Sequence, residues 1–162
     1  MAFSSSIYVD PQGYSGGLAM WWTKNVNISI FSFDKNMFDG CCSNNAYSAS
    51  WHFSFVYGKP NGQLRQEMWN KVFNLRRPGV IPWLLMGDLN LIGDSKDKKG
   101  KRPPRGADKR LLEELMGSCS LREVPYKGAR YTWTRGDISE RLDRALMNEQ
   151  WSHIFPNAQL FH

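Results

Sequence analysis

One stretch of this 162-residue chain constrains its structure more than any other, an apolar run over residues 82–90 that ends in a carboxylate and a carboxamide. Its length and composition predict a buried β-strand. Because residues i and i+2 of an extended chain point the same way, Asp88 and Asn90 are expected to face one cleft while Leu89 turns into the core. Gly87 allows the backbone to bend or to approach a ligand closely.

An acid and an amide held side by side on a rigid strand suit the chemistry of phosphate esters. Asp88 can hold a metal ion or an activated water, and Asn90 can hydrogen-bond a phosphoryl oxygen. The alternative is a polar exit from a strand into a loop, because Gly-Asp-x-Asn also occurs by chance. The interpretation therefore depends on the rest of the sequence.

Apolar residues in the first half of the chain switch between strand and helix spacing, which predicts an α/β or α+β protein. Alternating aromatic and branched residues predict strands at 18–22, 26–33 and 51–57. The first two are expected to form a hairpin across residues 23–25. A helix is predicted from Gly62 to Phe73 by a single apolar face, and it is expected to end at Arg76-Arg77-Pro78-Gly79. The apolar positions of that helix are Leu64, Met68, Trp69, Val72 and Phe73.

The second half of the chain continues the alternation. A helix is expected after Asp108, a candidate N-cap, and a short closing helix over 148–154. Residues 131–134 and 141–146 predict two strands joined by a turn at Gly136-Asp137. The predicted architecture is one domain over residues 1–162, in which a mixed or antiparallel sheet carries the first helix on one face.

Composition narrows the class of protein. The chain is 41% hydrophobic but has no apolar run long enough to cross a membrane and no signal-peptide pattern at its start. We therefore expect an intracellular protein, nuclear or cytoplasmic, with no membrane partner. Three cysteines, two of them adjacent, predict reduced thiols at Cys41, Cys42 and Cys119.

None of the three histidines has a catalytic partner in the sequence. His52 lies in an aromatic strand, where an imidazole is more often part of the core or the surface. His153 lies in the closing helical segment, and His162 is the last residue. The absence of a cluster at metal-ligand spacing argues against a zinc enzyme.

A net charge of +6 and a pI near 9.3 favour a polyanionic partner. Cations concentrate between Asp94 and Arg110, a few residues past Asn90, so this segment is expected on the rim of the same cleft. There it can contact the phosphates of DNA, or of RNA. The alternative is a solvated or disordered charged loop. The candidate nucleic-acid-binding residues are Lys96, Lys98, Lys99, Lys101, Arg102 and Arg105.

Five separated motifs, in this order, resemble plant non-LTR (LINE-type) retrotransposon endonuclease domains. They are GYSGGLAMWW (13–22), FVYGKP (55–60), WLLMGDLN (83–90), YTWT (131–134) and ERLDRAL (140–146). Such domains belong to the exonuclease/endonuclease/phosphatase superfamily, with the apurinic endonucleases, pancreatic DNase and inositol polyphosphate phosphatases. The resemblance runs from about Gly13 to Phe155 and implies a DNase-I-like fold, a four-layer α/β sandwich of which this chain is a part.

The resemblance also implies roles for three further residues. Tyr57 matches a tyrosine that contacts the phosphate, Asp143 an aspartate of the active site, and Thr132 a hydroxyl residue near the phosphate. From the residues alone, Tyr57 can equally be a packed ring at a strand end and Thr132 an ordinary β-branched strand residue. Arg141 or Arg144 can simply pair with Asp143.

Two family features are not recognised in this sequence, an N-terminal glutamate that is the principal metal ligand and a C-terminal Ser-Asp-His motif. His162 lacks the Ser-Asp context of that motif. The resemblance implies Mg²⁺ as cofactor and Asp88 as its ligand, so we expect a partial site that binds Mg²⁺ weakly and has little or no activity.

Two functions remain open. One is a metal-dependent phosphodiesterase resembling a DNA-nicking endonuclease, and the other is a noncatalytic nucleic-acid- or protein-binding module on the same scaffold. Because a domain truncated at both ends has uncovered sheet edges, a partner chain or self-association is expected to cover them.

Overall fold

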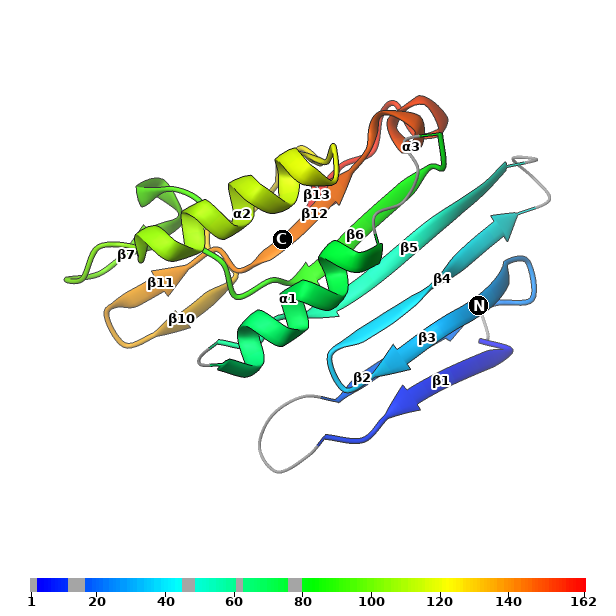
Figure 1. Cartoon of the computed structure of the whole chain (residues 1–162), viewed down its shortest axis with the longest axis horizontal. Coiled ribbons are helices and arrows are strands. Elements are labelled where there is room, and N and C mark those ends of the chain that lie inside the picture. The colour runs from blue at the N-terminus through cyan, green and yellow to red at the C-terminus, as the bar shows by residue number, and fades with distance from the viewer. Residues whose placement is uncertain (1–2, 12–16, 45–48, 61–62, 76–79) are drawn as a thin grey trace.

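The computed structural model describes residues 3–11, 17–44, 49–60, 63–75 and 80–162. Its centre is a six-stranded mixed sheet in the order β3-β4-β5-β6-β12-β8 (Figure 1). β5 and β6 pair in parallel, and the other neighbours pair antiparallel. The strands are β3 (Asn27–Asp34), β4 (Met37–Asn44), β5 (Ala49–Tyr57), β6 (Trp83–Asp88), β12 (Asp143–Met147) and β8 (Arg122–Glu123).

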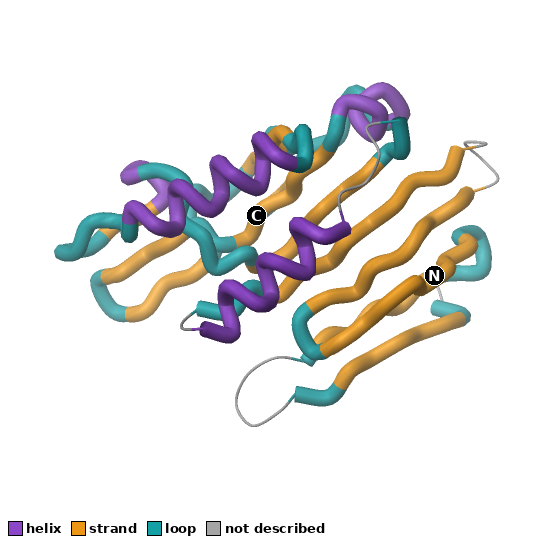
Figure 2. The backbone as a smooth tube through the Cα atoms, in the orientation of Figure 1, coloured by secondary structure: helices purple, strands orange, loops and turns teal. Residues whose placement is uncertain are grey.

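Two helices, α1 (Gln63–Leu75) and α2 (Gly106–Ser118), lie over one face of this sheet (Figure 2). α1 is the crossover that a parallel β5–β6 pair requires. The main core lies between the helices and the sheet, where Trp69 and Leu115 pack against Trp83, Leu85 and Leu146. The predicted helix on one face of the sheet is confirmed.

The opposite face carries a second layer. β1 (Ser5–Val9) and β2 (Leu18–Trp22) form a two-stranded antiparallel sheet whose inward side chains pack on Phe38 and Phe53. A third core joins Ala145 and Met147 of β12 to Trp151. Trp151 lies in the closing helix α3 (Glu149–Ile154), and Asn148 caps this helix by accepting a hydrogen bond from the Trp151 N–H.

A smaller sheet projects from the end of the main one. It has the order β10-β11-β7 and joins the chain segment after β6 to a hairpin before β12 (Figure 1). Its elements are β7 (Lys98–Lys99), β10 (Trp133–Arg135) and β11 (Ile138–Glu140), and a 3₁₀ turn, η1 (Ser95–Asp97), precedes β7. β9 (Tyr126–Lys127) and β13 (Leu160–Phe161) pair in parallel.

Three predictions about local structure are wrong. Residues 18–22 and 27–34 do not form a hairpin, because β2 pairs with β1 and β3 pairs with β4. The true turn follows β3, where the Asp34 carboxylate accepts the N–H groups of Asn36 and Met37. Likewise, the Gly136-Asp137 turn joins β10 to β11 and not to β12.

The third error concerns the start of α2. Arg105, and not Asp108, is the N-cap, and the helix begins at Gly106. Asp108 lies in the first turn, where it is buried and forms an ion pair with Arg65 of α1, with Nη2 and Oδ1 2.8 Å apart. Its carboxylate therefore links the two helices instead of capping one.

Part of the prediction falls outside the described residues. These parts are Gly13 to Gly16 of the first motif, the helix start at Gly62, the helix end at 76–79 and the side chain of Leu64. Within the described ranges, no helix combines the length and apolarity needed to cross a bilayer. The three cysteines are free, and burial raises the pKa of the Cys42 thiol to about 11, so this thiol stays protonated at neutral pH.

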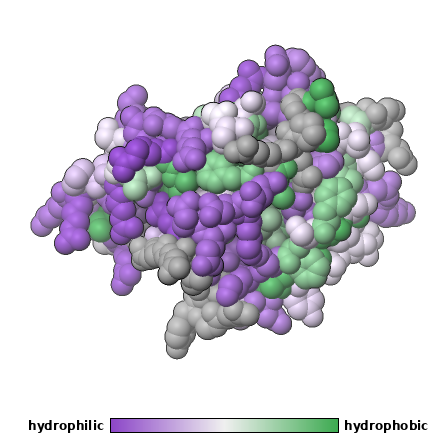
Figure 3. Space-filling view, viewed as in Figure 1, coloured by the Kyte–Doolittle hydropathy of each residue, from purple (hydrophilic) through white to green (hydrophobic). Residues whose placement is uncertain are grey.

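On the helix face of the molecule, polar side chains cover the region of α1, α2 and β7, and apolar ones lie over β3 to β5 (Figure 3). Phe31 and Phe33 of the edge strand β3 are exposed, as are Tyr8 and Trp21 of the β1–β2 sheet. A β-bulge between Ile30 and Ser32 interrupts the edge strand.

Candidate active site

Three predicted site residues lie in one row across the main sheet. Tyr57 is the register partner of Asp88 across the parallel β5–β6 pair, and Asp143 is the partner of Asp88 across the antiparallel β6–β12 pair. Partners opposite one another in antiparallel strands have Cα atoms about 4.5–5.5 Å apart and side chains on the same face. Sheet pairing thus brings together residues from three distant parts of the chain.

The row lies on the face of the sheet away from α1 and α2. Along β6, Leu85 packs under the helices while Met86 packs on the other side, and Asp88 is two residues beyond Met86. Along β12, Ala145 also packs on that other side, two residues beyond Asp143. Strand alternation therefore directs both carboxylates away from the helix core.

Tyr57 is fixed by a backbone clamp from the β3–β4 turn. The Tyr57 N–H donates to the Asn36 carbonyl at 2.8 Å, and Asn36 Nδ2 donates to the Tyr57 carbonyl at 2.9 Å. Asn36 is itself buried. The end of β5 is therefore held on one side by Asn36 and on the other side by β6.

Asn90 reaches the site by a different route from the predicted one. β6 ends at Asp88, and Asn90 has a left-handed backbone with φ of 50°. Asparagine tolerates this conformation. The Asn90 N–H donates to Asp88 Oδ1 at 2.9 Å, and Asn90 Nδ2 donates to the Gly58 carbonyl at 2.8 Å. Because an amide nitrogen carries two N–H bonds, one remains for Asp88 or a phosphoryl oxygen.

The surroundings of the Asp88 carboxyl disfavour its negative charge, which favours the binding of a cation. The pKa of this carboxyl is raised to about 6, from an ordinary value of 3.8. Burial is the largest cause and the charge of Asp143 adds to it, while the hydrogen bonds from Asn90 oppose the shift. The group is still ionised above pH 6. A cation between Asp88 and Asp143 would relieve the repulsion that disfavours the ionised form.

Thr132 holds Asp143 in place. Its hydroxyl oxygen accepts the N–H of Leu142 at 3.0 Å and that of Asp143 at 3.1 Å. The hydroxyl hydrogen stays free to donate to another group. Thr132 thus lies at the predicted site, and its contacts fix the start of the strand that presents Asp143.

Arg141 and Arg144 pair with other acids and not with Asp143. Both guanidinium groups contact the carboxylates of Asp97 and Glu123 at 2.6–2.9 Å. The simple pairing considered for Asp143 is therefore absent from the contacts among the described residues.

Asp88 and Asp143 are the acids that could hold a metal here. In the described part of the chain, no group of three His, Cys, Asp or Glu side chains is placed to bind one. Mg²⁺ is nevertheless often held by one or two carboxylates together with waters and substrate phosphates. The two acids, with the raised pKa of Asp88, fit a weakly held Mg²⁺ ion.

A hollow of about 510 Å³ adjoins Asp143. Its lining includes Met86, Tyr131, Thr132, Phe161 and His162. The His162 ring stacks on Tyr126, with centroids 5.1 Å apart, and its Nδ1 lies 3.1 Å from the Ala129 carbonyl. By contrast His153 is exposed, and His52 packs against Phe31.

Four of the six candidate nucleic-acid-binding residues line one hollow. Lys98, Lys101, Arg102 and Arg105 line a hollow of about 560 Å³, which Arg135 of the β10–β11 hairpin completes. We call this the basic hollow. The remaining two lie outside it: Lys96 lines a separate hollow beside α2, and Lys99 is exposed on β7.

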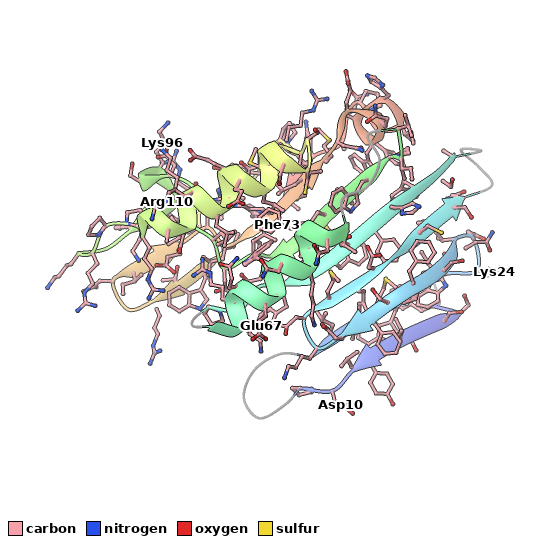
Figure 4. All side chains as sticks on the ribbon, viewed as in Figure 1. Asp10, Lys24, Glu67, Phe73, Lys96 and Arg110 are labelled. Carbon is pink, nitrogen blue, oxygen red and sulfur yellow. The ribbon has the colours of Figure 1, made fainter. Side chains whose placement is uncertain are left out.

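The chain from Asp94 to Arg110, which we call the basic segment, is built into the fold and is not a free loop. β7 pairs with β11, and Lys98 forms an ion pair with Glu140 across that pair. Figure 4 places Lys96 and Arg110 at the same end of the molecule as β7, and Lys24 at the far end. The basic segment therefore lies at the end that carries the hairpin.

Two supporting residues escaped sequence reasoning. Gly58 follows Tyr57 at the point where the chain passes Leu89, and a Cβ there would lie 2.2 Å from the Leu89 carbonyl oxygen, so no larger residue fits. Arg65 donates to the Asn90 carbonyl at 3.4 Å besides pairing with Asp108. The YG dipeptide after a strand was a signal for Gly58, whereas nothing local indicates the contact of Arg65.

Gly87 is required by the sheet. Its φ is 141°, and a Cβ there would lie 2.0 Å from the carbonyl oxygen of Val56 on the neighbouring strand. The predicted close approach is therefore present, but the neighbour is β5.

Comparison with known proteins agrees with this architecture. The endonuclease/exonuclease/phosphatase family model matches residues 2–159, so the chain belongs to this family. A search of curated protein sequences finds no match.

Three solved structures share the fold. The endonuclease domain of TRAS1, a telomere-specific non-LTR retrotransposon, superposes with a TM-score of 0.66 at 12% identity, covering 91% of this chain and 68% of that one. An AP endonuclease from Archaeoglobus fulgidus gives 0.60 at 10% identity, with 88% and 66% covered. The human Nocturnin catalytic domain gives 0.58 at 12% identity, with 90% and 60% covered.

These likenesses establish the fold, which is the predicted α/β sandwich of DNase-I-like proteins. The chain spans 60–68% of the length of the three structures. At 10–12% identity, the likeness concerns the fold and not the substrate.

The raised pKa of Asp88 predicts a pH-dependent effect of Asp88→Asn. The unfolded chain ionises Asp88 near pH 3.8 and the folded protein near pH 6, so the wild type loses stability as the pH rises through this window. The variant lacks this loss. Its free energy of unfolding, measured by urea titration, should exceed that of wild type at about pH 8 and approach it near pH 4. A difference that stays constant with pH would contradict the assignment.

Proposed function

We propose that this chain is a metal-dependent phosphodiesterase domain of the DNA-nicking endonuclease type. One observation supports this most strongly, the row of Tyr57, Asp88 and Asp143 at one end of the sheet in a member of the endonuclease/exonuclease/phosphatase family. A phenol, two carboxylates and the nearby Asn90 amide are the donors and acceptors that a phosphate diester needs.

Each group has a chemical task in the proposal. Asp88 and Asp143 are the residues that would hold Mg²⁺, which when bound supplies a Lewis acid for the phosphoryl group. The Tyr57 hydroxyl and the free N–H of Asn90 donate to phosphoryl oxygens, whose charge grows as water adds to phosphorus. Hydrolysis then breaks one P–O bond to the sugar and gives a phosphate monoester and a hydroxyl.

The pKa of Asp88 sets the working pH of such a site. Near pH 6 about half of the carboxyl groups are protonated and unable to hold a cation. Above that pH the carboxylate is available, and bound Mg²⁺ would extend its ionised range downward. The proposed activity therefore belongs to neutral and alkaline pH.

The basic hollow supports DNA as the substrate. Five cations line it against one acid, Asp137, and it lies on the hairpin that leads away from Thr132 and Asp143. A duplex whose scissile phosphate reached Asp88 could place neighbouring phosphates there. RNA carries the same phosphates, so the hollow alone does not select between the two.

A specific observation also favours a second function. Two carboxylates are few anionic ligands for a metal-dependent enzyme, and the described residues offer no larger cluster. A noncatalytic nucleic-acid-binding module would keep the basic hollow and cleave nothing. The two functions differ in whether DNA bound by the chain is cut.

Nicking of supercoiled plasmid tests the catalytic proposal. The purified 162-residue chain should convert supercoiled to open-circular DNA slowly with Mg²⁺ and not with EDTA. Asp88→Ala should lower the rate by about 100-fold or more, because it removes one of the two carboxylates proposed to hold the metal. Circular dichroism checks that the variant folds.

The matched control for this assay is Glu149→Ala, which removes an exposed acid on α3, beside the start of β6 and not beside the end that carries Asp88, and leaves the row intact. It should nick at the wild-type rate. Equal rates in wild type and Asp88→Ala would point to a contaminating nuclease. DNA binding without any cutting would leave the binding module as the function.

Salt dependence tests the basic hollow. The triple variant of Lys101, Arg102 and Arg135, each changed to Gln, should bind duplex DNA more weakly. Its plot of log affinity against log salt should flatten by about 0.9 for each phosphate that the variant no longer neutralises. Fluorescence anisotropy of a labelled duplex over a salt series measures both quantities.

A second triple variant has the same change in charge at a distance from the hollow. Lys24, Lys35 and Lys71 are scattered over the first half of the chain, and changing each to Gln should leave the slope close to wild type. If both triple variants flatten the slope equally, binding is due to net charge and the hollow has no special part in it.

A further inference from the structure

A single buried acid, Asp97, uses all of its polar groups. Its N–H donates to the Asp94 carbonyl at 3.0 Å and its carbonyl accepts the Arg141 N–H at 2.9 Å. Oδ1 accepts from Arg141 Nε at 2.9 Å, and Oδ2 accepts from Arg144 Nη2 at 2.6 Å and from the Asp94 N–H at 3.1 Å. The residue is therefore fixed to two parts of the chain at once.

One of those parts is the strand that carries Asp143. Arg141 and Arg144 flank this residue, and both are almost fully buried. Arg144 points to the helix side of β12, where it lies near Asp97, while Asp143 points to the opposite side. Asp97 thus holds β12 from behind, at the level where the strand presents its carboxylate to the site.

The other part is the basic segment. Asp97 closes a capping box with Asp94 around η1, and Lys98 follows it directly as the first residue of β7. The residues after β7 line the basic hollow. The side chain of Asp97 is bonded to the arginines beside Asp143, and its backbone continues into the segment that lines the hollow. Asp97 therefore connects the hollow to the strand of Asp143.

Buried ion pairs stabilise the link that Asp97 makes between β12 and the basic segment. Two buried guanidinium groups share two carboxylates, those of Asp97 and Glu123, and Arg141 also stacks on Tyr126 at 4.6 Å. Burial alone would raise the pKa of Asp97, but hydrogen bonds from Arg144 and Arg141 outweigh it and hold that pKa below its ordinary value. Removing one carboxylate leaves two buried cations with a single anionic partner, which is costly.

We propose that Asp97 is a positioning residue that fixes the basic hollow relative to Asp143, so that DNA bound in the hollow is aligned with the candidate site. The DNA part of this inference depends on the proposed function. Glu123 holds the same two arginines but lies on β8, which pairs with β12 and is not continuous in the chain with the basic segment. Among the acids that these arginines contact in the described chain, Asp97 alone lies in that segment.

The proposal predicts a change in DNA affinity that is opposite in direction to the change expected from charge alone. Asp97→Asn removes a negative charge, and on electrostatic grounds alone it should strengthen DNA binding. If Asp97 positions the hollow, the variant should instead bind a labelled duplex roughly tenfold more weakly, a typical effect of loosening a coupled network. Its salt dependence should also flatten, because fewer phosphates are contacted together.

Three further variants separate the explanations. Asp97→Glu keeps the charge but lengthens the side chain, and it should also weaken binding. Glu123→Gln takes a carboxylate from the same two arginines but leaves the bonds of Asp97 to them in place, and Asp137→Asn removes an acid that forms no ion pair with either arginine. Both should bind DNA as tightly as wild type or more tightly. Asp97→Glu also provides the test if Asp97→Asn does not fold.

Hydrogen exchange gives a readout that needs no DNA. In both Asp97 variants the amide hydrogens of Lys98 and Asp143 should exchange faster, while that of Leu85 in the core should not change. If the wild-type chain does not bind DNA, the proposed function fails. Hydrogen exchange still tests whether Asp97 fixes the basic segment to the strand of Asp143. Unchanged exchange at Lys98 and Asp143, or Asp97→Asn binding DNA as tightly as Asp137→Asn, would overturn the inference.

Discussion

The structure depends on the position of β6 between a parallel neighbour, β5, and an antiparallel neighbour, β12. This pairing sets Asp88 opposite Tyr57 on one side and opposite Asp143 on the other. A shift by one residue in either register would turn a whole strand over and separate the row. The apolar residues Leu85 and Leu146, fully buried under the helices, make such a shift costly.

The same arrangement separates two kinds of chemistry on opposite faces of one sheet. Behind β12, the buried cations of Arg141 and Arg144 form ion pairs with Asp97 and Glu123. In front of it, Asp88 and Asp143 repel one another, and this repulsion adds to burial in raising the pKa of Asp88. An unrelieved repulsion is expensive to keep in a structural position and useful in a site that receives a cation.

Local patterns were sufficient for the elements that carry the site. The apolar run of β6, the helix over its neighbour and the Asn148 cap of α3 all follow from spacing and capping rules. β4 was missed because MFDGCCSN contains few strand-forming residues, although it pairs along its whole length with β5. That omission produced the false hairpin between β2 and β3.

Non-local contacts explain the rest. The ion pairs of Asp97 join residues 44 and 47 positions apart, and no periodicity in the sequence indicates them. The left-handed Asn90 is similar, because its conformation depends on Asp88 and on Gly58 of the neighbouring strand end. The meeting of Tyr57, Asp88 and Asp143 was expected from family resemblance and not from any local rule.

The central claim is that Asp88 and Asp143 form one cation site. Titration of the Asp88 carboxyl carbon by NMR, with and without Mg²⁺, tests this most directly. The account predicts a pKa near 6 without the metal, a lower value with Mg²⁺, and a smaller effect of Mg²⁺ in Asp143→Asn. An Asp88 that titrates at the ordinary pKa of a carboxyl group and ignores Mg²⁺ would contradict it.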